Sequence, residues 1–407
     1  KDHHFLRDMF CSLIAAAVLL QAASMQRGPG EHAPKGLAEP EDGPEWLLDF
    51  ALGPRDEIPQ LIIEQVDGAS CTLRVLAFWF TYLPIADAIV RAHARGIDVR
   101  VLLDARSTTH KLEGACSTRA GCAHLAARRN VAQYLQSQGV PVQIIHPSAR
   151  PGPVRSRPPI FHPKAIVVDG VTACFGSSNW YLRALQEHDE HYLCVHSRRV
   201  AAGFERFAAR RQIAGWSDPH ARSNGSGCEL CADQLQCNST GAHHTADAPP
   251  QVLDFRLLAG PFFGPESALD EVWQKYIRAA RSRVRVVHWR LDWAPLVDDL
   301  RLASRLGVNV SIFTETQVKS TATSDSPIST HVFGPRRTAA HGQPHTILFH
   351  HKVILVDEDI VLLGSVNAFR KSLREDSEDL TVFRSVHVAA RLDALCERHG
   401  QFRPGGV

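Results

Sequence analysis

The stretches HPKAIVVDGVTACFGSSN, residues 162–179, and HHKVILVDEDIVLLGSVN, residues 350–367, share the same key residues at the same offsets and decide the fold. Six matches after the paired histidines, at roughly one in 20 per position, would arise by chance about once in 10⁷–10⁸. The chain therefore carries an internal duplication. The first set is His162, Lys164, Asp169, Gly176, Ser177, Asn179 and Glu190, and the second is His350, Lys352, Asp357, Gly364, Ser365, Asn367 and Glu378.

Each copy has the pattern of two neighbouring strands followed by a polar turn. His162 and Lys164 are two residues apart, so in an extended segment both side chains project from one face. The apolar run 165–168 indicates a strand buried on both faces, with 171–175 as its neighbour. The turn 176–179 then brings Ser and Asn donors beside them. Without the cluster of acids that Mg²⁺ prefers, these groups predict an anion pocket, and we expect a phosphate in it.

A strand, helix, strand pattern precedes each motif and recurs 211 residues later. Such units pair parallel strands and cover the sheet with helices. We therefore predict an α/β fold with one lobe over 45–216, a linker over 217–250 and a second lobe over 251–407. The expected elements are Leu73–Phe78, Ile85–Ala94 and Ile97–Leu103, then Val284–Trp289, Leu296–Leu306 and 308–313.

Two related lobes packed face to face would place two histidines on opposite sides of one phosphorus. One imidazole would attack phosphorus, while the other would protonate the leaving oxygen and later deprotonate water. We expect Lys and Asn side chains to bind the non-bridging oxygens. Glu190 and Glu378 could accept a hydrogen bond from the far ring nitrogen of each histidine and fix its tautomer. The oxygen-binding side chains are Lys164, Lys352, Asn179 and Asn367.

The paired runs resemble the two H-x-K-x4-D motifs of the phospholipase D superfamily, and both copies are complete. The resemblance implies two pseudo-twofold-related α/β/α lobes, each a mixed, largely parallel sheet flanked by helices. It also implies a phosphohistidine intermediate with no metal or cofactor, His162 as nucleophile and His350 as acid and base. Asp169 and Asp357 would help to position lobe and site, supported by Ser177 and Ser365. Pro163 departs from the pattern by removing a backbone donor, so it should lie at an edge or at a strand's start.

The 407 residues include 45 Lys and Arg against 43 Asp and Glu, a net charge of +2 that gives no general affinity for polyanions. The run Phe10–Leu20 is too short to span a bilayer. With Arg7 before it and small residues after it, residues 1–26 have the pattern of a secretory signal, which predicts a secreted or periplasmic protein. A buried helix or an interfacial anchor is the alternative interpretation.

The ten cysteines fall into two groups. We expect Cys71, Cys174 and Cys194, which lie in apolar strand-like runs, to be small core residues. The others that follow the signal lie mostly in polar loops, where disulfides are permitted in an exported protein. Cys228 and Cys231, with nearby Cys and His residues, could instead bind zinc, although no second C-x-x-C is present.

The substrate is less well defined by the sequence. We predict a phospholipase D-type phosphodiesterase that hydrolyses phospholipid head-group esters and needs no obligate protein partner, acting as a monomer. The alternative is an endonuclease with the same residues, since a loop with Arg150, Arg155 and Arg157 could follow nucleic-acid phosphates. A non-catalytic binding protein is a third hypothesis. Aromatic candidates for the mouth of a lipid site are Trp79, Phe80, Tyr82, Phe262, Phe263 and Trp293.

Overall fold

The computed structural model describes residues 43–114, 129–146, 158–211, 253–318, 328–333, 336–338 and 345–401. The predicted signal over 1–26, the linker over 217–250, the loop arginines and the loop cysteines lie outside these residues. The boundaries of the two lobes therefore stay predictions. None of the helices in the described ranges has the length and apolar character needed to cross a bilayer.

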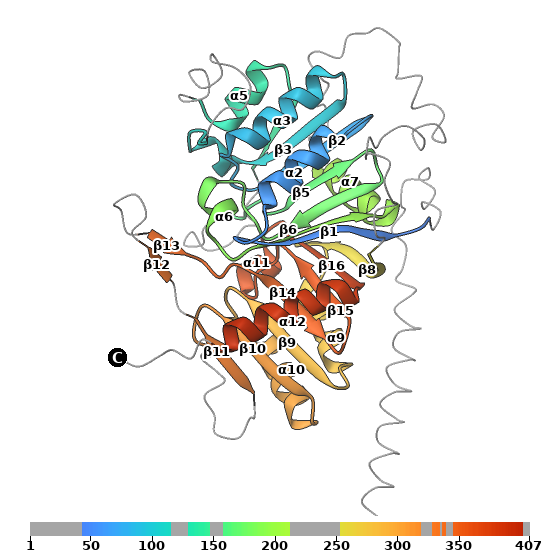
Figure 1. The fold of residues 1–407 in the computed structure, drawn as a ribbon, viewed down its shortest axis with the longest axis vertical. Helices are drawn as coiled ribbons and strands as arrows, with labels where there is room; N and C mark the ends of the chain where they lie inside the picture. Colours follow the sequence, from blue (N-terminus) through green and yellow to red (C-terminus); the bar gives the residue numbers. More distant parts are fainter. Residues whose placement is uncertain are drawn as a thin grey trace, which may run out of the picture. The chain divides into compact units, whose positions relative to one another are not determined.

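The N-terminal lobe, coloured blue to green in Figure 1, is built on a seven-stranded mixed sheet whose strand order is β1-β7-β6-β5-β2-β3-β4. Its parallel pairs are β2–β3 and β3–β4, and the other pairs are antiparallel. Its elements are β1 (Trp46–Leu52), α2 (Ile58–Asp67), β2 (Thr72–Ala77), α3 (Leu83–Ala94), β3 (Asp98–Asp104), α5 (Val131–Ser137), β4 (Val142–Ile145), β5 (Lys164–Val168), β6 (Thr172–Gly176), α6 (Leu182–Gln186), β7 (His191–His196) and α7 (Arg198–Arg211).

The C-terminal lobe repeats this plan with a sheet in the order β11-β10-β9-β14-β15-β16-β8. A short ribbon, β12 (Arg336–Thr338) with β13 (His345–Ile347), stands apart from it. The remaining elements are β8 (Arg256–Phe263), α9 (Leu269–Arg278), β9 (Arg283–His288), α10 (Ala294–Arg305), β10 (Asn309–Thr314), β11 (Ser329–Val332), β14 (Lys352–Val356), β15 (Ile360–Gly364), α11 (Arg370–Arg374), β16 (Asp379–Arg384) and α12 (Val386–Gln401).

The predicted strand, helix, strand units are confirmed in both lobes. A proline lies in the first turn of α3 and of α10, where its missing N–H costs no hydrogen bond. After each helix the chain turns through a glycine with positive φ, Gly96 at 87° and Gly307 at 92°. The sheets are mixed as expected, but antiparallel pairs outnumber parallel ones, because each motif forms a hairpin in the middle of its sheet.

The two lobes share one hydrophobic core between their sheets. The last helix of each lobe packs on the first strand of the other. Phe207 of α7 stacks on Phe263 of β8 with ring centroids 4.2 Å apart, and Arg391 of α12 donates to the backbone oxygen of Phe50 in β1. This reciprocal packing brings the N-terminal ends of β5 and β14 to the lobe interface.

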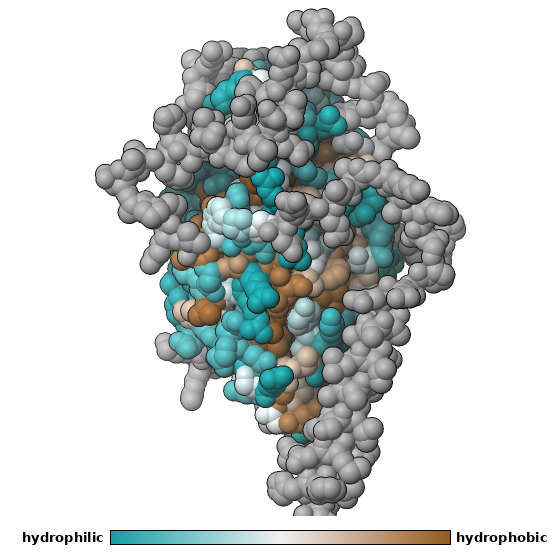
Figure 2. All heavy atoms as spheres, turned by 90° about the vertical axis from the view of Figure 1, so that its right-hand side faces the viewer, coloured by the Kyte–Doolittle hydropathy of each residue, from teal (hydrophilic) through white to brown (hydrophobic). Residues whose placement is uncertain are grey.

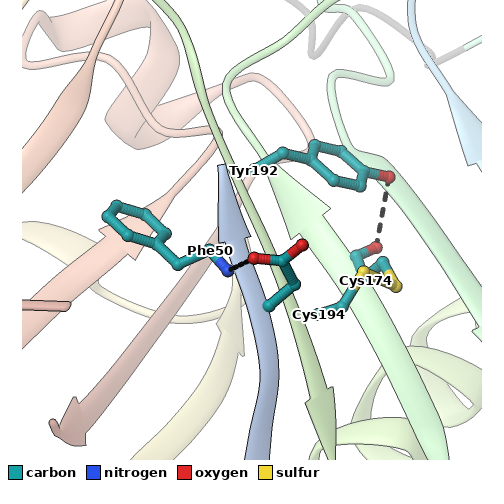
Figure 3. The surroundings of a disulfide bond; sticks show 5 residues. Phe50, Cys174, Tyr192 and Cys194 are labelled. Atoms are coloured by element: carbon teal, nitrogen blue, oxygen red, sulfur yellow. Dashed lines mark hydrogen bonds between the residues drawn. A yellow bond between two sulfur atoms is a disulfide. The ribbon is translucent and has the colours of Figure 1, made fainter. Parts of the chain in front are cut away.

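Cys174 and Cys194 are buried in the core as predicted, but they also form a disulfide that the sequence analysis did not predict (Figure 3). The two residues lie directly opposite each other on the buried neighbouring strands β6 and β7. Tyr192 donates its hydroxyl to the backbone oxygen of Cys174 beside the bridge. Their apolar sequence context correctly indicated burial, but the strand register that pairs them is not visible in the sequence.

Candidate active site

His162 and Lys164 lie where the chain enters β5, at the lobe interface. Pro163 precedes the first residue of this strand, as the sequence predicted, so no ladder hydrogen bond is lost. Lys164 is fully buried, and its Nζ donates to the backbone oxygen of His162 at 2.5 Å. Lys352 makes the same contact with His350 at 2.7 Å. A lysine has three N–H groups, so each ammonium retains donors for a substrate.

Each catalytic-candidate histidine is oriented by a glutamate from the other lobe. Nδ1 of His162 lies 2.7 Å from Glu378 Oε2, and Nδ1 of His350 lies 2.8 Å from Glu190 Oε1. With Nδ1 donating to a carboxylate, Nε2 keeps its lone pair for phosphorus or for a proton. Each glutamate therefore lies within hydrogen-bond distance of one histidine, and the pairing is crossed between the lobes.

The backbone repeats this crossed arrangement. The amide of His162 donates to the oxygen of Ser377, and the amide of His350 donates to the oxygen of Asp189, both at 2.8 Å. One residue earlier, the amide of Phe161 donates to Asp104, and its counterpart Phe349 donates to Glu315. These contacts fix both imidazoles to the same interface. His162 is also among the groups that lower the pKa of His350.

Serine hydroxyls hold the two glutamates. Ser177 donates to Glu190 at 2.5 Å, and Ser365 donates to Glu378 at 2.7 Å. Ser372 also donates to Glu378, a contact that the sequence reasoning missed. Burial raises the pKa of Glu190 to about 8 and that of Glu378 to about 7, while the neighbouring lysines oppose the rise.

Burial also changes the basic groups of the site. It lowers the pKa of Lys164 to about 7 and that of Lys352 to about 8. It lowers the pKa of His162 and of His350 well below the ordinary value, and the lysines lower both further. The negative charge of a bound phosphate would favour the charged forms of these lysines and histidines and so raise their pKa values.

The two asparagines lie in the turns beside the lysines and are nearly fully buried. The side-chain oxygens of Asn179 and Asn367 have no hydrogen-bond partner among the described residues. Phe78 and Trp289 form the aromatic walls, with ring centroids 4.7 Å from His162 and 5.3 Å from His350. These walls were not identified from the sequence, although the 211-residue repeat relates them.

Asp169 and Asp357 lie at the opposite ends of β5 and β14 from the histidines. Each has positive φ, 52° and 53°, in the turn that follows its strand. Asp169 accepts hydrogen bonds from the amides of residues 70–72, and Asp357 accepts from those of 281–283. Both carboxylates therefore fasten a hairpin to the first strand of the unit within their own lobe, at the ends of β5 and β14 that lie away from the histidines.

Several other histidines surround the site. His288 and His351 are both fully buried. His191 is also buried, with its ring centroid 5.8 Å from that of His351. His188 Nδ1 lies 3.9 Å from Glu190 Oε1, behind the glutamate that contacts His350. Within the described residues, no three His, Cys, Asp or Glu side chains are arranged to hold a metal ion.

Residues 62–211 and 274–399 match the family described as "Cardiolipin synthase, PLD-like domain". The major cardiolipin synthase of Bacillus subtilis (strain 168) is 22% identical over 337 residues, which are 77% of this chain and 61% of that protein. The chain therefore matches less than two thirds of that relative's length.

Among solved structures, phosphatidylserine synthase from Haemophilus influenzae Rd KW20 aligns with a TM-score of 0.54 at 16% identity, covering 87% of this chain and 85% of that one. Nuc, a phospholipase D family member from Salmonella typhimurium, is 26% identical over 40% of this chain and 91% of its own, with a TM-score of 0.31. The family match covers more than half of the chain and includes both motifs. The chain belongs to the phospholipase D-like family.

Proposed function

We propose that this protein is a phosphodiesterase that hydrolyses the head-group ester of phospholipids through a phosphohistidine intermediate. The observation that carries the proposal is the crossed pairing of His162 with Glu378 and of His350 with Glu190. This pairing orients two imidazoles at one interface and leaves both Nε2 atoms for chemistry. Two buried lysines beside them supply charge for the non-bridging oxygens.

The reaction runs in two displacements. Nε2 of one imidazole attacks phosphorus as the bond to the head-group oxygen breaks, and the other histidine, as imidazolium, protonates that oxygen. The second histidine, now neutral, then takes a proton from water. The hydroxide equivalent attacks phosphorus, the P–N bond breaks, and the first imidazole is regenerated. Phosphatidic acid and the free alcohol are the products.

We assign the nucleophile to His162. The cations that lower its pKa include Lys371 and Arg106 in addition to the two site lysines. For His350 the corresponding additional groups are histidines. Burial is the largest cause of the lowered pKa of both imidazoles and favours the neutral form of each. The assignment therefore follows the resemblance to the phospholipase D superfamily. His350 would then be the acid and base.

The choice of phospholipid as substrate is supported by the extent of the match to a cardiolipin synthase, which covers most of this chain. We also propose that the protein works outside the cytoplasm. The disulfide between Cys174 and Cys194 supports this, because such bonds persist in oxidising compartments. Free-thiol labelling of the denatured protein, with and without prior reduction, checks the bond.

Purified protein in EDTA, assayed on phosphatidylcholine vesicles and on plasmid DNA, tests the function. Release of choline with formation of phosphatidic acid is the expected result. Nicked or degraded DNA without lipid turnover would replace the proposal by the nuclease hypothesis. No turnover on a broad panel of diesters would favour the binding-protein hypothesis.

A further inference from the structure

Trp79 is an exposed aromatic residue next to the wall of the candidate active site. Figure 2 shows a face on which hydrophobic and hydrophilic side chains are mixed, so single exposed apolar residues are ordinary. Trp79 differs from them by its location. It follows Phe78, whose ring contacts His162. The large hydrophobic side chains exposed in the described ranges are Leu48, Trp79, Leu302, Leu306 and Val386.

The other aromatic residues that the sequence offered for the mouth of the site are less accessible. Phe80 and Phe263 are buried in the core. Tyr82, Phe262 and Trp293 are half-buried and pack against the core clusters. Trp79 retains 37% of its surface exposed. The structure thus reduces six candidates to one exposed ring.

The backbone and two neighbouring rings hold Trp79 in this position. Its φ of 48° lies in the left-handed region, which a bulky residue adopts only when its surroundings enforce it. The imidazole of His110 stacks on the indole with centroids 5.2 Å apart and an interplanar angle of 13°. Tyr181, two residues after Asn179, contacts it at 5.4 Å. The ring is therefore preorganised at the site.

Basic side chains lie on the segments that hold this ring. Lys111 and Arg183 are exposed, and Arg106 lies over Phe78 at 5.9 Å from the ring centroid. The acidic neighbour Glu113 accepts hydrogen bonds from Thr81 and Leu182, so its carboxylate is already engaged. An exposed indole with basic residues on the segments beside it matches the boundary of an anionic lipid layer, where tryptophan and basic residues both bind favourably.

The duplicated lobe provides an internal comparison. The position equivalent to Trp79 is Arg290, which lies over the ring of Trp289 and forms an ion pair with Asp292 at 2.6 Å. Tyr181 is replaced by Phe369. The ring that could enter a lipid layer is therefore on the His162 side alone, within the described residues.

We propose that Trp79 is an interfacial anchor that inserts its exposed edge into the surface of an anionic phospholipid layer beside the active site. This rests on the proposed function and adds the surface on which the enzyme acts. The insertion would hold a head-group phosphate near the two histidines. Stacking of a nucleic-acid base is disfavoured, because His110 already covers one face of the indole.

The test measures co-sedimentation with phosphatidylglycerol vesicles for the wild type, Trp79→Ala and Trp79→Phe. We expect Trp79→Ala to weaken binding at least about tenfold and Trp79→Phe to restore part of it. Leu306→Ala, which removes a more exposed side chain from the C-terminal end of α10, is the matched control and should bind normally. Circular dichroism verifies that each variant is folded.

Activity is measured in parallel on vesicles and on a water-soluble phosphodiester. The ratio of vesicle to soluble activity should fall about fivefold or more in Trp79→Ala.

Equal vesicle binding by Trp79→Ala and the wild type, or no vesicle binding by the wild type, would overturn the anchor even if the soluble diester is hydrolysed. A loss of single-stranded DNA binding in Trp79→Ala, with vesicle binding intact, would overturn it in favour of a base-stacking role. Absence of turnover on both substrates by a wild type that binds vesicles would instead contradict the proposed function.

Discussion

The two halves of the candidate active site have the same histidine, lysine and glutamate contacts in different surroundings. His162 with Lys164 and His350 with Lys352 share the strand start, the lysine contact and the crossed glutamate. Four buried or nearly buried histidines lie around the second half, and their counterparts in the first half are not histidines. In each of the following pairs the histidine lies near His350, and the second residue occupies the equivalent position near His162: His188 and Asp376, His191 and Asp379, His288 and Ala77, and His351 and Pro163.

This difference shows which contacts the duplication had to retain. The histidines, lysines and glutamates of the proposed site are the same in both halves, whereas the layer behind them has diverged in charge. Asp376 forms an ion pair with Lys371 beside Glu378, but the equivalent His188 faces Glu190 as a group whose pKa burial lowers to about 4. The two imidazoles therefore share their lysine and glutamate contacts but lie in different electrostatic surroundings.

The largest expected effect comes from removing either histidine. His162→Ala and His350→Ala should each lower kcat at least about 10⁴-fold, because His162 forms the bond to phosphorus and His350 transfers the protons that both displacements need. Mass spectrometry after acid-free quenching distinguishes the two halves. With a p-nitrophenyl diester, whose leaving group needs no acid, His350→Ala should accumulate a phosphorylated peptide containing His162. Phosphorylation of His350 in His162→Ala would reverse the assignment.

A smaller effect is expected from the crossed glutamates. Glu378→Gln and Glu190→Gln should each lower kcat about 10²-fold or more, because the amide no longer stabilises the imidazolium and can select the wrong tautomer. Glu378→Gln should impair attack for every leaving group. Glu190→Gln should impair poor leaving groups more than p-nitrophenol, because it acts through His350. Equal dependence on the leaving group in both variants would contradict the crossed assignment.

The histidines behind the second half predict loss of stability in acid. Burial lowers the pKa of His191, His288 and His351, so the unfolded chain binds these protons near pH 6.5 and the folded chain does not. The free energy of unfolding should therefore fall as the pH drops below about 6.5, by up to about 1.4 kcal/mol per pH unit for each proton. The raised pKa values of Glu190 and Glu378 act oppositely, since their contribution is lost as the pH rises towards 7–8.

Urea denaturation at several pH values measures this dependence. His288→Ala copies the residue of the first half, Ala77, and should reduce the acid slope by about one proton while lowering stability at neutral pH through the cavity it leaves. An unchanged slope would show that His288 is not a source of the acid sensitivity.

The sequence was sufficient for the features that repeat and insufficient for those that depend on how the lobes meet. Two complete motifs at equal offsets predicted the strands and the side chains that gather at the site. The crossing of Glu190 to His350 was not predictable, because either glutamate could have served either histidine. The disulfide of Cys174 with Cys194 depends on the register of β6 and β7. The four buried histidines near His350 have no histidine counterparts near His162, so comparison of the two copies did not reveal them.

The smallest effects should be equal in the two halves and should appear in stability. Asp169→Ala and Asp357→Ala each remove a carboxylate that accepts several backbone amides far from the histidines. We expect each to lower the free energy of unfolding by about 1–3 kcal/mol, because those amides lose their acceptor, and to lower kcat less than tenfold. Asp→Asn at either position retains one acceptor oxygen and should recover part of the loss. A variant of normal stability whose kcat falls as far as that of the glutamate variants would give the aspartate a part in the chemistry. Equal losses of stability in Asp169→Ala and Asp357→Ala would show that this scaffold contact is the same in both lobes, although the surroundings of the two histidines differ.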